Sequence, residues 1–140
     1  LRLEKGHIIV SQDTDGMTHP SEVGLDWAMN RTKPDFVGRR SVDILAKAPL
    51  TRQLVGFSLA ITAPKPLEGH LVIRDGNIVG NVTSCEVSPT LGRIIGLAYA
   101  HPDDAMPGGS IWVRTEGGVA VQARVEALPF YDPDTERQLL

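Results

Sequence analysis

The chain has 140 residues, of which 41% are hydrophobic and 22% charged, and its formal net charge is −3. This length suits one compact domain, or one domain with a remnant of another. Because no run approaches the ~20 apolar residues of a transmembrane helix and no basic stripe is present, we expect neither a membrane nor a nucleic acid as a partner. A single cysteine excludes an internal disulfide, and we expect a soluble protein of the cytoplasm.

The first third of the chain gives mixed structural signals. Residues 1–5 are good helix formers, and Gly6 stands where a glycine commonly ends a helix. Short apolar runs at residues 7–10 and 23–29 predict two strands. Residues 39–47 predict one short helix, which a following proline would stop.

Strand-like runs and turn signals alternate in the rest of the chain. The composition of 14 Gly and 10 Pro with only 5% aromatic residues favours short strands joined by tight turns. Asp75-Gly76 is a strong hairpin signal, because glycine supplies the positive φ that such a turn needs. The predicted strands are residues 53–61, 71–74, 78–84, 94–100, 111–114 and 120–128. Their spacing predicts a six-stranded antiparallel barrel of the Greek-key type.

Together, these patterns predict a mainly β protein with two parts. Residues 48–140 would form the C-terminal β-barrel domain, and residues 1–47 would be an α+β remnant of a preceding domain. Because the first residue is Leu1 rather than methionine, we expect the chain to be the C-terminal piece of a larger protein.

Local motifs predict no catalytic or metal site. The four histidines and the cysteine are widely separated along the sequence, and no two of them have the spacing of metal ligands. Residues 13–16 begin like a calcium loop, but the twelfth position is Gly24, where a bidentate glutamate is required. Cys85 has no basic neighbour that would activate its thiol, so we expect a thiol of the core or of a strand end. Arg2 could clamp a carboxylate, and Trp27 could stack on a flat ring. A solvated helix end and a core indole are the more common roles of such residues, and both alternatives stay open here.

Several segments together resemble the aminomethyltransferase (glycine cleavage T-protein) family. Residues 1–6 (LRLEKG) are similar to its Leu-Arg-Leu-Glu helix end, and residues 18–27 (THPSEVGLDW) to the Thr-x-Pro-x-Glu-x-x-Leu-x-Trp segment that follows it. Residues 80–84 (GNVTS) resemble a strand of the family's C-terminal barrel. The order and spacing of these motifs extend the resemblance over almost the whole chain.

Two further segments are most similar to the α subunit of heterotetrameric sarcosine oxidase. These are residues 6–16 (GHIIVSQDTDG) and 128–133 (LPFYDP). That resemblance implies a parent enzyme that demethylates sarcosine oxidatively and passes the one-carbon unit to tetrahydrofolate. FAD, FMN and NAD would belong to other parts of the assembly, and the partners would be folate and the other subunits of a hetero-oligomeric oxidase.

The resemblance also assigns three residues to the folate pocket. Arg2 matches an arginine of that pocket, and Trp27 and Glu22 match the second motif as its supports. In the family the catalytic aspartate and the glutamate that reads the pterin lie upstream of Leu1. We therefore expect the parent to be an enzyme, and this chain alone to lack catalytic residues, metal ligands and a bound cofactor.

Three alternatives remain open. The parent could be a glycine cleavage aminomethyltransferase, whose partner is a lipoyl carrier protein. It could be a folate-binding regulator without transfer activity. The chain could also be a structural barrel that mediates only subunit contacts.

Overall fold

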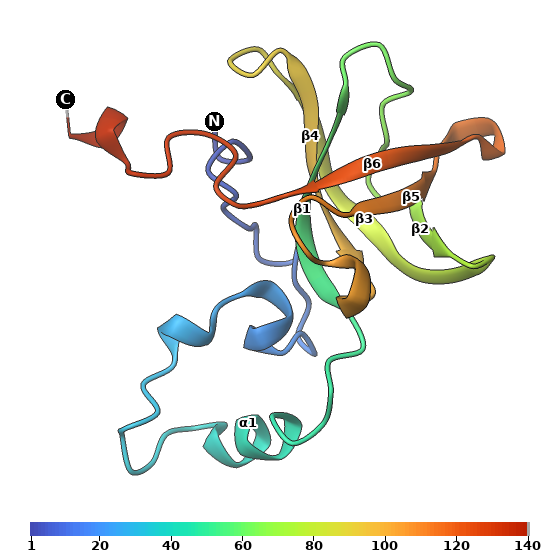
Figure 1. Cartoon of the computed structure of the whole chain (residues 1–140). Helices are drawn as coiled ribbons and strands as arrows, with labels where there is room; N and C mark the ends of the chain where they lie inside the picture. The colour runs from blue at the N-terminus through green and yellow to red at the C-terminus, as the bar shows by residue number, and fades with distance from the viewer. Residues whose placement is uncertain (140) are drawn as a thin grey trace.

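The computed structural model describes residues 1–139, and its centre is a closed barrel of antiparallel strands (Figure 1). The strands are β1 (Gln53–Ala60), β2 (Leu71–Arg74), β3 (Asn77–Ser88), β4 (Arg93–Ala100), β5 (Ser110–Arg114) and β6 (Ala120–Glu126). Around the barrel they follow the order β1-β4-β3-β2-β5-β6, and the pairing of β1 with β6 closes it. The predicted mainly β fold with a six-stranded antiparallel barrel is therefore confirmed for the described residues.

The hairpin between β2 and β3 has the predicted two-residue turn. Arg74 pairs with Asn77, which leaves Asp75 and Gly76 as the loop. Their φ angles are 50° and 78°, as a type I′ turn requires at both central positions. Glycine meets that demand without strain, and aspartate is one of the few other residues that tolerate it.

Strands β1 and β4 are buried on both faces. Their alternate residues point in opposite directions, so Phe57 and Ile94 lie inside the barrel. The opposite faces supply Leu54 and Leu97 to a second apolar cluster, which also contains Leu3 of the N-terminal segment. The N-terminal segment therefore packs against the outer wall of the barrel at these two strands.

The first residues form a helical turn that ends at glycine, as predicted. Gly6 has a φ of 66°. Its backbone N–H donates to the carbonyl of Leu3 at 2.9 Å, and the N–H of His7 donates to the carbonyl of Arg2 at 3.1 Å. This pair of bonds is the usual glycine termination of a helix.

The two strands predicted in the N-terminal segment are wrong. In residues 7–10 only Val10 makes a β-bridge, an isolated one with Thr14. Residues 20–28 instead form two 3₁₀ turns, η1 (Pro20–Val23) and η2 (Asp26–Ala28). Proline fixes φ near the helical value and has no N–H for a ladder, so Pro20 favours the first helical position over a strand.

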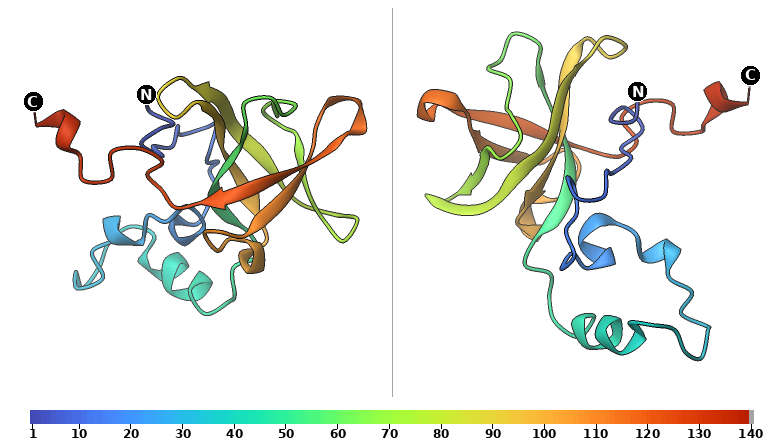
Figure 2. Two further views of the ribbon diagram at one scale, coloured as in Figure 1. Left: turned by 45° about the horizontal axis from the view of Figure 1, so that its top comes forward. Right: turned by 180° about the vertical axis from the view of Figure 1, so that it is seen from behind.

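Helix α1 (Arg39–Leu45) confirms the predicted short helix, which ends two residues earlier than expected. It lies apart from the barrel in both views of Figure 2, and its apolar residues Ile44 and Leu45 are exposed. The division into domains at residues 47 and 48 stays a prediction. No helix in the described part of the chain is long and apolar enough to cross a membrane.

Residues 128–132, here called the C-terminal strap, follow β6 and run beside the N-terminal turn (Figure 1). The Lys5 ammonium donates to the carbonyl of Asp132 at 2.5 Å and lies 3.3 Å from its carboxylate. The N–H of Tyr131 donates to the carbonyl of Glu4 at 3.0 Å. The strap is therefore attached to the N-terminal turn on one side of the barrel.

Candidate functional site

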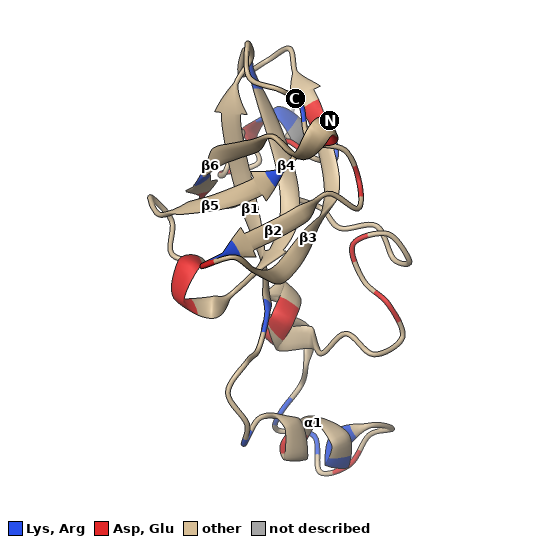
Figure 3. Ribbon diagram, turned by 90° about the vertical axis from the view of Figure 1, so that its right-hand side faces the viewer, with Lys and Arg blue, Asp and Glu red and all other residues tan. Residues whose placement is uncertain are grey.

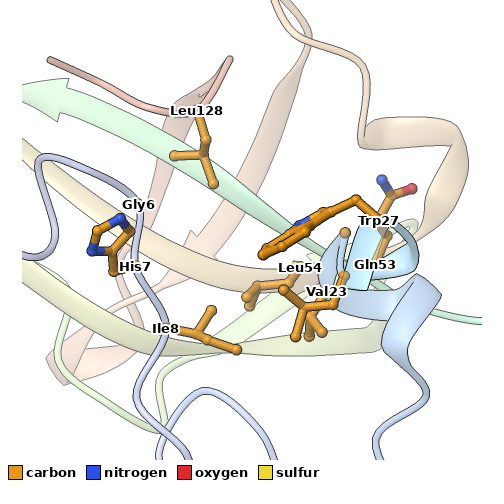
Figure 4. Close-up of a pocket in the computed structure, with 10 residues that line it drawn as sticks. Gly6, His7, Ile8, Val23, Trp27, Gln53, Leu54 and Leu128 are labelled. Carbon is orange, nitrogen blue, oxygen red and sulfur yellow. The ribbon is translucent and has the colours of Figure 1, made fainter. Parts of the chain in front are cut away.

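An open groove of about 470 Å³ lies between the N-terminal segment and the barrel (Figure 4). The side chains that define its walls are His7, Ile8, Val23, Trp27, Leu54 and Leu128. None of its ten lining residues is an aspartate, glutamate, lysine or arginine. Grooves of this size, with mainly apolar walls, suit an uncharged part of a small molecule.

Trp27 is the most exposed large side chain of the groove. Its side chain belongs to η2 and is 82% exposed, and Figure 4 shows the indole directed over the groove. The Asp26 carboxylate fixes this turn, because it accepts hydrogen bonds from Ser21 at 2.7 Å and from Arg31 at 3.0 Å. An indole held in this way offers a flat face for stacking on a planar ring.

Arg2 lies in a different set of contacts, around the fully buried Asp13. One arm of its guanidinium donates to the Asp13 carboxylate at 3.0 Å and to the carbonyl of His7 at 2.8 Å. The other arm donates to the hydroxyl of Ser84 at 2.7 Å. Arg2 therefore connects the N-terminal turn to β3, and it is not among the residues that line the groove.

The Asp13 carboxylate receives four donors in all. Besides Arg2, these are the N–H of Ile9 at 2.7 Å, the hydroxyl of Thr83 at 2.5 Å and that of Ser84 at 2.7 Å. A buried charge is tolerated when it is paired and hydrogen-bonded in this manner. The residues that looked like a failed calcium loop therefore contribute a structural carboxylate. The bond to Ile9 also explains why residues 7–10 form no strand, because this N–H is bound to Asp13.

Glu22 belongs to a third set of contacts. Its carboxylate accepts a hydrogen bond from Arg52 at 3.0 Å. The Arg52 guanidinium lies 4.4 Å from the centre of the Tyr99 ring, a cation–π arrangement. Burial raises the pKa of the Tyr99 phenol, and that hydroxyl donates to the carbonyl of Asp13 at 2.8 Å. Glu22 thus fastens η1 to β4 from outside the groove.

The three residues that the sequence assigned to one pocket therefore have different positions. Trp27 lines the groove, whereas Arg2 and Glu22 anchor the segments on either side of it. Sequence reasoning missed the remaining walls of the groove. Leu54 and Leu128 are examples, because each is a single leucine in a strand or bend and carries no local signal of binding. Whether any of the three contacts folate stays a prediction.

Cys85 and the histidines offer no reactive centre. Burial raises the pKa of the Cys85 thiol to about 12, although the charge of the nearby Lys65 acts to lower it, so the thiol stays protonated near neutral pH. His19 and His101 accept backbone hydrogen bonds at the start of 3₁₀ turns. In the described part of the chain, no group of three or more His, Cys, Asp or Glu residues could hold a metal ion.

A charged cluster lies at the end of β2, away from the residues that line the groove (Figure 3). The Arg74 guanidinium is 3.1 Å from the carboxylate of Asp103, 3.5 Å from that of Asp104 and 3.9 Å from that of Asp75. The hydrogen bond that Arg74 donates to the Asp103 carboxylate raises the pKa of Arg74. The neighbouring carboxylates of Asp103 and Asp104 are thus both paired with one arginine.

The closed barrel, with an N-terminal segment packed on its outer wall, defines a small all-β module with a ligand-sized groove. Residues 52–132 match the model of the glycine cleavage T-protein C-terminal barrel domain. The chain therefore belongs to this family, and the resemblance read from its motifs is confirmed at that level.

The relatives are named aminomethyltransferases. That of Halothermothrix orenii is 39% identical over 130 residues, which are 93% of this chain and 36% of the relative. That of Thermotoga maritima is 36% identical over 99% of this chain and 37% of the relative. This chain thus spans little more than a third of the length of these proteins.

A solved structure has the same fold. The glycine cleavage system aminomethyltransferase T of Bartonella henselae matches with a TM-score of 0.81 and 24% identity, over 93% of this chain and 37% of that chain. The comparisons support the glycine cleavage alternative better than the sarcosine oxidase reading. A special closeness to the sarcosine oxidase α subunit is not shown.

Proposed function

We propose that this chain forms one side of the tetrahydrofolate site in an aminomethyltransferase of the glycine cleavage type. Its family and the names of its relatives support the reaction class. The observation that carries the proposal is the groove, where an exposed indole meets uncharged walls. Such walls suit the flat ring system of the folate and not its charged tail.

The three sequence-assigned residues have separate roles in this proposal. Trp27 stacks on a ring of the ligand. Arg2 is a positioning residue: through Asp13 and Ser84 it holds the turn that presents Gly6 and His7 to the groove. Glu22 is also a positioning residue, because its bond to Arg52 holds η1, which supplies Val23.

The chain itself supplies binding and orientation in this proposal. Proton transfer at the folate needs a positioned carboxylate, and the groove contains none. The catalytic aspartate is expected upstream of Leu1, as the resemblance implies. A lipoyl carrier protein would be the partner of the complete enzyme.

A second candidate is the corresponding part of a sarcosine oxidase α subunit, with other oxidase subunits as partners. It rests on residues 6–16 and 128–133 alone. The family and the relatives give no support to FAD, FMN or NAD, so we derive no step through them.

The proposal is tested by titrating the full chain with tetrahydrofolate and following its two indole N–H signals by ¹⁵N NMR. We expect the Trp27 signal to shift in a saturable manner, with a dissociation constant weaker than micromolar because further walls lie elsewhere. Since an aromatic pair contributes about 0.5–1.5 kcal/mol, Trp27→Ala should weaken binding roughly two- to tenfold, measured by calorimetry because this variant lacks the Trp27 signal.

Trp112→Ala is the matched control, because Trp112 is also exposed but lies on β5, outside the groove. It should leave the titration unchanged. A shift of Trp112 instead of Trp27, or a micromolar constant for this chain alone, would contradict the proposal.

A further inference from the structure

The C-terminal strap supplies one wall of the groove, in addition to its contacts with the N-terminal turn. Leu128 lines the groove together with Trp27, and Figure 4 shows the two side chains extending from separate segments. The Leu128 side chain is 41% exposed, so a molecule in the groove can contact it directly.

Two glycines provide the space in which Leu128 lies. A Cβ on Gly56 would come within 2.7 Å of the Leu128 Cδ2 atom, and one on Gly6 within 2.9 Å. Such contacts are closer than real Cβ atoms accept, so the position of Leu128 depends on both glycines. The absence of side chains at these two positions brings the strap close to β1 and to the N-terminal turn.

The strap is also fastened beyond Leu128. The Lys5 and Asp132 side chains of its ion pair are only 11% and 9% exposed, and ion pairs so shielded from water are screened less than surface pairs. Together with the Tyr131 bond to Glu4, this pair fixes the strap on its far side. Leu128 therefore lies in a segment that is fixed by contacts on both of its sides.

The other walls belong to the apolar core. Leu54 is a buried member of the second apolar cluster, and Ile8 and Val23 pack against it. Changing them would disturb the packing between the N-terminal segment and the barrel. Leu128 is outside that cluster and half-exposed, so its size can vary without loss of the core.

We infer that Leu128 is the specificity-determining residue of the groove. It limits the width opposite Trp27 and so selects among flat, uncharged rings by their size. The inference rests on the proposed function, in which a ring of the folate occupies the groove. It adds the residue that decides which ring systems fit.

The test measures how two uncharged probes, benzamide with one ring and 2-naphthamide with two, bind the full chain. Binding is followed at the Trp27 indole N–H by ¹⁵N NMR, with Trp112→Phe used to assign the signals. We expect Leu128→Ala to shift the ratio of the two dissociation constants at least about fivefold toward the larger probe. Leu128→Phe should shift it in the opposite direction.

Leu67→Ala is the matched control, since Leu67 is 49% exposed and does not line the groove. It should leave the ratio unchanged. If Leu128→Ala does not fold, Leu128→Val provides a smaller truncation with the same expected direction. A ratio that is the same in the wild type and in the folded Leu128 variants overturns the inference.

The probes separate this inference from the proposed function. A changed ratio without any tetrahydrofolate shift at Trp27 would mean that Leu128 selects rings in a groove that serves another ligand. A tetrahydrofolate shift with an unchanged ratio would mean that the groove binds folate and that Leu128 does not select the ring.

Discussion

Asp13 joins the N-terminal segment to the barrel more directly than any residue singled out from the sequence. We expect Asp13→Ala to lower the free energy of unfolding by about 3 kcal/mol, because removing one partner of a buried pair leaves the other charge without compensation. The value lies at the low end of the usual range, since the Arg2 side chain is 34% exposed. Urea unfolding followed by circular dichroism measures it.

Asp26→Ala is the comparison for this prediction. Asp26 also pairs with an arginine, Arg31, but both side chains are about half exposed, and such pairs contribute about 0–1 kcal/mol. Equal destabilisation by the two substitutions would show that the Asp13 contacts have no special weight.

Sequence patterns pointed to Arg2 but not to its partner. The bond from Arg2 to Ser84 joins residues that are 82 positions apart, a separation that no local pattern encodes. The failed match to a calcium loop left Asp13 without a role, because a single carboxylate in a polar loop looks the same in sequence whether it is solvated or buried. Trp27 does line the groove, and a tryptophan in a family motif is a distinctive signal in the sequence, but its contact with folate stays a prediction.

The buried Cys85 thiol makes the stability of the chain depend on pH in the alkaline range. Its pKa is about 12 when folded, against 9.0 as the ordinary value. Above pH 9 the unfolded chain therefore loses a proton that the folded chain keeps, so stability falls as pH rises from about 9 toward 12. We expect the urea midpoint to fall more between pH 8 and 10.5 in the wild type than in Cys85→Ala. If the urea midpoints of the wild type and Cys85→Ala fall equally, the thiol does not contribute to the pH dependence of stability.

At the scale of elements, the barrel was predictable and the N-terminal segment was not. The six strands each show β-rich runs between glycine or proline turns, and strand pairing in the barrel agrees with that local preference. Residues 7–10 and 23–29 have similar composition, yet their backbone groups are bound by Asp13 or by 3₁₀ turns. Tertiary contacts outweigh a weak β preference there.

The close approach of β1 to the C-terminal strap gives a prediction at this scale. Gly56→Ala should push Leu128 and Phe130 away from β1, because the new Cβ would lie within 2.7 and 2.9 Å of their side chains. Because the contacted atoms are the far ends of side chains that can turn away, we expect a loss of about 1 kcal/mol, at the low end for overpacked sites, measured by thermal melting. Gly16→Ala is the control, since Gly16 has open space around it; an equal effect of both would contradict the close approach.

At the scale of the whole molecule, stability should be uneven. Arg31, Lys33, Arg40 and Lys47 are exposed in a segment that has few contacts with the barrel. Regions of this kind open locally at low free-energy cost. We therefore expect limited trypsin digestion to cleave first within residues 31–47 and to leave a resistant product that contains β1 to β6. Mass spectrometry identifies the product, and early cleavage at Arg114 or Arg124 would contradict this expectation.

Closure of the barrel at β1 has a consequence for the order of folding. Each of the pairs β2–β3, β3–β4 and β5–β6 joins neighbours along the chain, whereas Ser58 of β1 meets Glu126 of β6 from 68 residues away. Pairings between distant residues cost loop entropy before they gain contacts, which slows folding. We therefore expect the neighbouring strands to pair before β1 and β6 close the barrel. Because Phe57 and Leu54 of β1 belong to the two different apolar clusters, we expect the barrel interior and its contact with the N-terminal segment to become ordered together.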